Sequence, residues 1–153
     1  MLNPQGHTVM SGTYTGYLTA VLAASGRQRE IAKPGFYEHI HALAGRLSKG
    51  ITEAFRATGI PGIVHGIGAR FGLYLGVTEL VANYRQAVRA DRQLEKRFLV
   101  GCLTRGLYFH DYGHTMHHGF SSQHSVADID EALNIIEDTL RQMKVEPRIA
   151  TDR

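Results

Sequence analysis

Residues 63–77 read IVHGIGARFGLYLGV, and this stretch decides the fold. Two apolar runs, 63–67 and 71–75, alternate with glycine or other residues in the manner of β-strands. Gly66 and Gly68 flank Ile67 where the first run gives way to the second, which predicts a hairpin or a bulged bend as the connection. A pair of antiparallel strands is therefore the centre of the predicted structure.

Helical periodicity surrounds this hairpin on both sides. Gly59 suits the left-handed position after a helix, and Gly106 ends another helix. Ser125 and Asp128 have the spacing of a capping box at the start of the last helix. Apolar residues three and four apart predict helices over 14–32, 36–58, 83–105 and 126–143, and further short strands are predicted over 107–110 and 119–122.

The order of these elements predicts the fold class. It reads α, α, β-β, α, β-β, α, and helices on one face of a small antiparallel sheet are the economical arrangement. We therefore predict an α+β fold whose sheet is covered by helices, and the first helix need not belong to that layer.

Length and composition exclude several classes of protein. The chain has 153 residues, of which 43% are hydrophobic and 20% charged, as in one soluble globular domain. A net charge of +3 and a pI near 9.2, without a clustered basic motif, predict neither a nucleic-acid partner nor a membrane. The uncharged residues 1–26 lack the basic start of an export signal. The single cysteine, Cys102, excludes an internal disulfide and favours a reducing compartment, so we expect a cytoplasmic protein.

Histidine is the most conspicuous residue type, with nine in the chain. A cluster of them could converge on a metal ion, since imidazole is the commonest metal ligand, or could line a polar turn. Neither a helical His-Glu-x-x-His spacing nor a cysteine set completes a tetrahedral site. We favour a binding-pocket role for one or two members of the cluster, which comprises His110, His114, His117, His118 and His124.

Other catalytic patterns find little support in the sequence. No Gly-x-Ser-x-Gly elbow is present, and Cys102 falls on an apolar helical stripe, as a small core residue does. Phe71 stands where a dinucleotide fingerprint would need its next glycine. Arg70 lies between apolar strand residues, where its charge needs a partner. That partner is a structural ion pair, which the burial argument favours, or the carboxylate of a ligand.

The segment 11–16, SGTYTG, allows two interpretations. Hydroxyl groups and unpaired backbone amides at the start of a helix form a ready anion site. Ser11, Thr13 and Thr15 are also ordinary candidates for the N-cap of the first helix, and spacing alone favours this second interpretation.

Taken together, these segments resemble the C-terminal part of a class III pyridoxal-phosphate-dependent aminotransferase, near the glutamate-1-semialdehyde aminomutase branch. Residues 10–17, MSGTYTGY, are similar to the Gly-Thr-x-Ser-Gly-Asn-Pro stretch of that family. Residues 66–73, GIGARFGL, resemble its Val-Gly-Ser-Met-Phe-Gly-Leu strand. Residues 106–108 and 118–130 resemble its closing strands and last helix, so the likeness covers nearly the whole chain in order.

The resemblance implies a division into two parts. Residues 1–34 would be the end of a large domain, and residues 35–153 the small C-terminal domain of a fold-type I enzyme. Gly12 and Thr13 would contact the phosphate of pyridoxal phosphate in the neighbouring subunit of a homo-oligomer. The substrate, an amino acid or amino-carboxylate, would meet a pocket wall that includes Arg70, His117 and His118.

Departures from the family pattern limit what the resemblance implies. Gly16, Tyr17 and Leu18 replace Gly-Asn-Pro, and the histidine-rich stretch replaces residues that shape the aminomutase pocket. The Schiff-base lysine of the family precedes the Gly-Thr motif, and none of the four lysines of this chain matches it. We therefore expect no catalytic residue and no activity from the chain alone, unless a second chain supplies the lysine. The alternatives are a non-catalytic module that binds itself or a partner, and a histidine-rich metal-binding protein.

Overall fold

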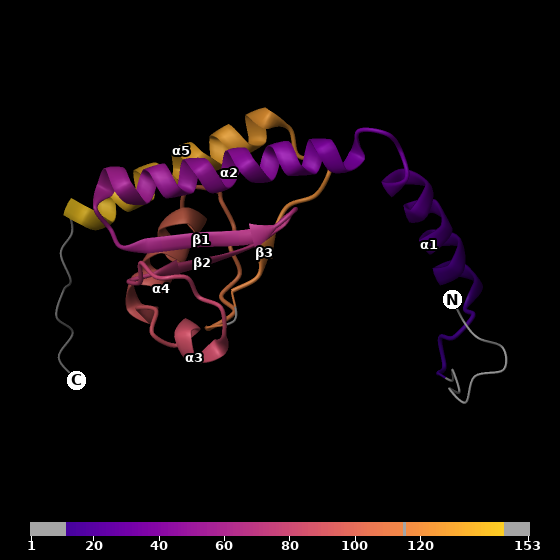
Figure 1. Ribbon diagram of the computed structural model, residues 1–153, viewed down its shortest axis with the longest axis horizontal. Helices are drawn as coiled ribbons and strands as arrows, with labels where there is room; N and C mark the ends of the chain where they lie inside the picture. The colour runs from indigo at the N-terminus through magenta and orange to yellow at the C-terminus, as the bar shows by residue number, and fades with distance from the viewer. Residues whose placement is uncertain (1–11, 115, 146–153) are drawn as a thin grey trace. The chain divides into compact units, whose positions relative to one another are not determined.

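The computed structural model describes residues 12–114 and 116–145 and has an α+β fold, as predicted (Figure 1). The chain divides into two compact units, with the boundary in the sequence between Phe36 and Tyr37. No helix among the described residues is both long and apolar enough to cross a membrane. The elements in chain order are α1 Leu18–Ile31, α2 Phe36–Thr58, β1 Gly62–Ile67, β2 Arg70–Leu75, α3 Tyr84–Ala87, α4 Arg92–Leu103, β3 His118–Gly119 and α5 Val126–Val145.

The first unit consists of a turn followed by α1. The helix begins at Leu18, later than the predicted start at residue 14, and its N-cap Tyr17 makes no side-chain capping bond. Thr13 and Thr15 are therefore not N-caps, and Ser11 lies outside the described residues. The chain turns first, because the Thr15 amide donates to the Gly12 carbonyl at 2.9 Å and Gly16 adopts a φ of +75°. No residue of α1 is buried.

The predicted hairpin is confirmed in the second unit. Strands β1 and β2 pair antiparallel from Gly62 opposite Leu75 to Ile67 opposite Arg70. β3 adds two residues to the other edge of β2, which gives the order β1-β2-β3. Glycine is needed at position 66, because a Cβ atom there would lie 2.1 Å from the Arg70 carbonyl oxygen.

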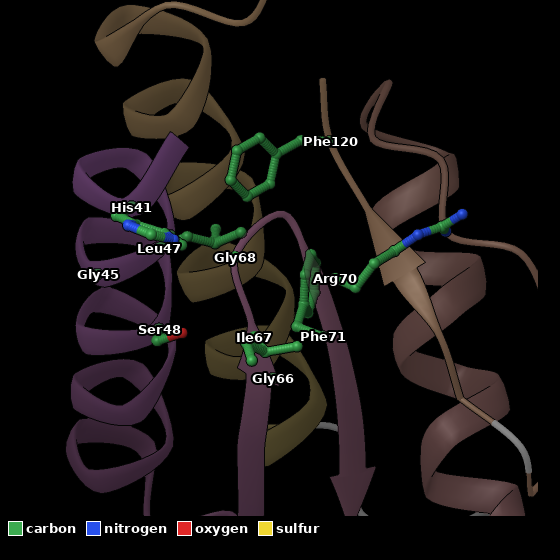
Figure 2. A pocket seen from close by; sticks show the side chains of 11 residues that line it. His41, Gly45, Leu47, Ser48, Gly66, Ile67, Gly68, Arg70, Phe71 and Phe120 are labelled. Carbon is green, nitrogen blue, oxygen red and sulfur yellow. The ribbon is translucent and has the colours of Figure 1, made fainter. Parts of the chain in front are cut away.

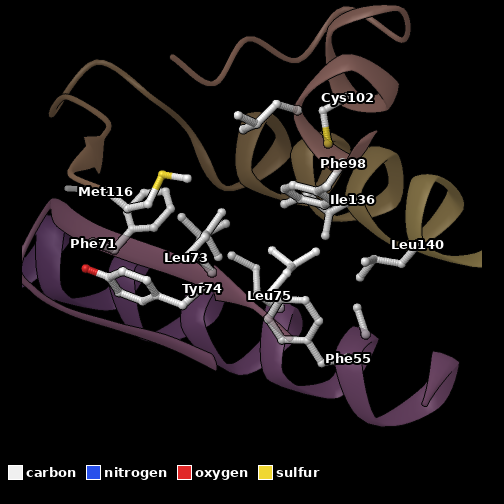
Figure 3. Close-up of a cluster of buried hydrophobic side chains, with 14 of the residues drawn as sticks. Phe55, Phe71, Leu73, Tyr74, Leu75, Phe98, Cys102, Met116, Ile136 and Leu140 are labelled. Atoms are coloured by element: carbon white, nitrogen blue, oxygen red, sulfur yellow. The ribbon is translucent and has the colours of Figure 1, made fainter. Parts of the chain in front are cut away.

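Side chains alternate between the two faces of this sheet, and the helices cover one of them. Phe71, Leu73 and Leu75 lie on the covered face and are all buried. Figure 3 shows Leu73 and Leu75 extending from β2 toward Phe98 and Ile136, which come from α4 and α5. Arg70, Gly72 and Tyr74 alternate with these residues on the opposite face. Gly72 and Tyr74 are buried there as well, so this face is open to solvent at the Arg70 end of β2 and covered along the rest of the strand.

The long helices are packed through α5. A Cβ atom on Gly50 of α2 would lie 2.5 Å from Leu133 of α5, and one on Gly101 of α4 would lie 2.6 Å from Thr139 of α5. The predicted end of the second helix and start of the last helix are confirmed. Gly59 follows α2 with a φ of +70°, and at the start of α5 the Ser125 amide donates to Asp128 Oδ2 at 2.6 Å.

The predicted third helix and second pair of strands are wrong in part. The segment 83–105 forms two helices, because Asp91 caps α4 through the amides of residues 93 and 94. The Asp91 amide also donates to the Leu75 carbonyl at 2.8 Å, so this connection takes the edge of β2. Residues 107–110 therefore form no strand, and β3 is limited to His118–Gly119 instead of 119–122.

Candidate functional site

The turn before α1 holds two of the predicted site residues, Gly12 and Thr13. Both are exposed, and within the described residues no hydrogen bond engages the Thr13 hydroxyl. The first amides of α1 have no partner in the preceding turn of helix, as at any helix start, and no side chain caps them. The turn therefore presents a hydroxyl and backbone donors to solvent, which is the chemistry of an anion site.

Arg70 and His117 lie where the face of the sheet opposite Phe71 is open to solvent, and this area is the open face. Arg70 pairs with Gly119 in the register of β2 and β3, and its Nη1 donates to the His117 carbonyl at 3.4 Å. Both side chains are exposed. The favoured ion pair of Arg70 is not present among the described residues, because the open face leaves the guanidinium in water, where no counter-charge is required.

His118 points to the opposite face, away from Arg70 and His117. It pairs with Phe71, is 4% exposed, and its ring centroid lies 4.9 Å from that of Phe109. Burial, followed by the charges of His117 and His110, lowers the pKa of His118 to about 4. His118 is therefore neutral at pH 7, and its Nε2 has no hydrogen-bond partner among the described residues.

Aromatic rings line the chain between α4 and β3. The Tyr112 ring lies against His117, with centroids 3.7 Å apart and ring planes tilted by 34°, and its centroid is 4.4 Å from that of His110. The Tyr108 hydroxyl is 2.7 Å from Nδ1 of His110. Tyr112 was not among the predicted site residues, although its place between His110 and His114 in the histidine cluster was a usable signal.

The histidine cluster does not converge on one point. His117 and His118 are sent to opposite faces because they are neighbours in an extended segment. His114 contacts the Tyr84 ring, and His124 interacts with Ser121. Among residues 12–114 and 116–145, no group of three or more histidine, cysteine or acidic side chains could hold a metal ion.

A cavity of about 330 Å³ lies between α2 and the turn of the hairpin. His41 and Ser48 of α2 face Gly68 and Phe120 across it (Figure 2). Figure 2 also shows that the Arg70 side chain extends over β3, away from α2. The guanidinium of Arg70 therefore lies on the open face of the sheet and not in the centre of this cavity.

Comparisons with known proteins place this fold. No family model matches the sequence. The structure is similar to an omega-transaminase from Sphaerobacter thermophilus, with a TM-score of 0.74 and 20% identity over 91% of this chain and 31% of that one. It is also similar to the FumI protein of Sphingopyxis sp. MTA144 in its PLP internal aldimine form, with a TM-score of 0.68 and 16% identity over 90% and 30% of the two chains. A transaminase with PLP bound gives a TM-score of 0.65 and 17% identity over the same shares.

These likenesses define the class of fold. The chain has the fold of one part of a transaminase, and it spans about 30% of the length of the structures it matches. The predicted α+β arrangement of a hairpin and flanking helices is thus also found in one part of known transaminase structures.

Proposed function

We propose that the chain is the C-terminal part of a pyridoxal-phosphate-dependent class III aminotransferase near the aminomutase branch, acting on an amino acid or amino-carboxylate. The observation that carries the proposal is the likeness of its fold to transaminases over 91% of its length. The ordered motifs at residues 10–17, 66–73 and 118–130 support the same family.

The turn before α1 is the proposed contact for the cofactor phosphate. The Thr13 hydroxyl is exposed and unengaged among the described residues, and Gly12 brings the backbone close without a side chain, so the donor set fits a phosphate. When bound, pyridoxal phosphate would supply an electron sink for the amino substrate. The contribution of this chain would be to hold the phosphate in the neighbouring subunit of a homo-oligomer.

The open face of the sheet is the proposed wall of the substrate pocket. Arg70 has guanidinium donors beyond the one directed at the His117 carbonyl, and a planar guanidinium matches a carboxylate in two parallel hydrogen bonds. His117 and the adjacent Tyr112 would bound the same space. His118, predicted as a third pocket residue, would support this wall from the core side.

The catalytic lysine is proposed to lie outside residues 1–153. Lys33 pairs with Glu30 and Lys49 with Glu53, all on exposed surfaces. Lys96 and Lys144 are exposed on α4 and α5. An exposed amine of this kind is not activated as a Schiff-base nucleophile, so the chain alone should not transaminate.

The proposal is tested by native mass spectrometry and the visible spectrum of the untagged protein, purified from its own cells. We expect an assembly with a second chain and the visible absorbance of lysine-bound pyridoxal phosphate. Thr13→Val should weaken retention of the cofactor, whereas Thr15→Val in the same turn should not. A colourless assembly built of this chain alone would contradict the proposal.

That contrary outcome would support a second candidate, a self-associating module without catalysis. The observation in its favour is the apolar surface of α1. Leu18 is 67% exposed and Leu22 62% exposed, and both lie on one helical face with Val21. Apolar patches of this kind mark interaction surfaces in soluble proteins.

A further inference from the structure

Arg92 joins α4 to the chain that carries the aromatic rings. It lies in the first turn of α4 and is held from both sides. Its Nη1 donates to Glu95 Oε2 at 2.7 Å and to the Gly113 carbonyl at 3.0 Å, and its Nη2 donates to Asp111 Oδ1 at 2.6 Å. One guanidinium thus connects the helix to the side chain of Asp111 and the backbone of Gly113, which are 19 and 21 residues away.

These two positions flank Tyr112. Asp111 Oδ1 also accepts the Gly113 amide at 2.9 Å, which closes a tight turn around the tyrosine. Gly113 has a φ of +65°, so the turn uses the left-handed region open to glycine. The amide of Gly113 and the charge of Arg92 lower the pKa of Asp111, and the carboxyl is ionised at neutral pH. The backbone on both sides of Tyr112 is therefore fixed through Arg92.

Glu95 fixes the helix end of this connection. Its side chain is 1% exposed and its Oε1 has no hydrogen-bond partner among the described residues. The ion pair with Arg92 is thus the main compensation for burying this carboxyl, and it restricts the guanidinium to one orientation. Glu95 lies on the same helical stripe as Phe98 and Cys102, which are both buried.

We propose that Arg92 is the positioning residue of the substrate wall. By holding Asp111 and Gly113, it sets the Tyr112 ring against His117, next to the Arg70 guanidinium. The inference rests on the proposed function in so far as this wall binds substrate. Its structural part, the control of the Tyr112–His117 pair by Arg92, does not depend on the cofactor.

A fork of donors is required for this role. The planar guanidinium of Arg92 donates hydrogen bonds to one acceptor on α4 and, at the same time, to two acceptors on the distant turn. Lysine carries its charge at a single point and lacks this fork, so Arg92→Lys should keep the pair with Glu95 and release the turn. Asp111→Ala should release the turn and leave the buried pair intact, since Asp111 is half exposed.

The test uses NMR of the full chain without cofactor. In the parent chain, we expect the contact with the Tyr112 ring to displace the ring signals of His117, and the Gly113 amide to exchange slowly. Arg92→Lys and Asp111→Ala should both remove the displacement and speed the exchange of Gly113 about tenfold or more, because a hydrogen bond to a charged group is lost. Arg85→Gln, an exposed arginine on α3 without such contacts, is the matched control and should change neither signal.

The outcomes separate this inference from the proposed function. Unchanged His117 and Gly113 signals in either variant would overturn the inference, even if the melting temperature fell. In an assembly that transaminates, Asp111→Ala should raise KM for the amino substrate by a larger factor than it lowers kcat. An unchanged KM with a released turn would overturn the link to substrate. Absence of transamination in every assembly, with the turn released as expected, would count against the proposed function alone.

Discussion

His118 should make the folded chain sensitive to mild acid. Its imidazole is enclosed by Phe71, Phe109 and Tyr112, with ring centroids 4.9–5.9 Å away. Burial, together with the charges of His117 and His110, lowers the pKa of the side chain from its ordinary value of 6.5 to about 4. Protonation of His118 is therefore unfavourable in the folded state and ordinary in the unfolded state.

The sign and size of the effect follow from this difference in pKa. Between pH 6.5 and pH 4 the unfolded chain binds more protons at His118 than the folded chain, so the free energy of unfolding falls as the pH falls. The loss is about 2 kcal/mol at pH 5 and approaches about 3 kcal/mol below pH 4, by the usual 1.36 kcal/mol per pKa unit. Glu95 acts in the opposite direction, because burial raises the pKa of its carboxyl and acid relieves that penalty.

A variant isolates the contribution of His118 from all others. Urea unfolding of the parent chain and of His118→Phe at pH 7 and pH 5 gives, for each protein, the loss in free energy of unfolding between the two pH values. Phenylalanine suits the aromatic surroundings and does not titrate, so its loss should be about 2 kcal/mol smaller than that of the parent chain. His41→Gln, at an exposed histidine, is the control and should keep the loss of the parent chain. Equal losses in the parent chain and His118→Phe would refute the reasoning.

Two further predictions concern packing. Gly66→Ala should lower the free energy of unfolding by about 1–3 kcal/mol, because the new Cβ would meet the backbone of β2. Gly45→Ala should raise the free energy of unfolding by about 0.5–1 kcal/mol, because a Cβ there meets nothing within 4 Å. Chemical unfolding of the two variants measures both changes. Cys102 should resist a thiol reagent at pH 8 until the chain unfolds, because it is fully buried and burial raises its thiol pKa to about 12; labelling in native buffer at the rate seen in denaturant would contradict this.

The elements that the sequence predicted well are those in which the hydrophobic pattern and the residues at the ends of the element indicate the same structure. The second helix has a strong apolar stripe and ends at Gly59, and the last has both a stripe and the Ser125–Asp128 box. The hairpin was predictable because glycine is required where β1 and β2 approach most closely. In each case local chemistry and packing specify the same structure.

The failures arise where a tertiary contact overrides the local pattern. Periodicity continued from 83 to 105, but Asp91 bonds to the edge of β2 through its amide and caps a new helix with its side chain. That edge was then closed to a strand at 107–110. Arg70 was expected to need an ionic partner because its neighbours are apolar, yet strand alternation turns it toward the open face.

The role of Arg92 was missed, although the sequence contains a signal for it. Glu95, Phe98, Leu99 and Cys102 follow the spacing of one buried stripe, so an acidic residue occupies a core position. A buried carboxylate needs a cation, and Arg92 lies three residues before it. The sequence could not predict that Asp111 joins Arg92 and Glu95, because the contact between Arg92 and Asp111 depends on the path of the chain from α4 to β3.

The buried pair of Arg92 and Glu95 is poorly explained by stability alone. Replacing a buried ion pair by apolar side chains of similar volume is often neutral or stabilising, because removing charges from water costs as much as their attraction gains. Glu95 also leaves one oxygen without a partner among the described residues, and its neighbours on the stripe are apolar. An apolar pair at these positions would fill the core, but it would leave Asp111 and the Gly113 carbonyl without the donors that hold them. The ion pair therefore makes physical sense as a device that fixes the turn around Tyr112, which is the role we infer for it.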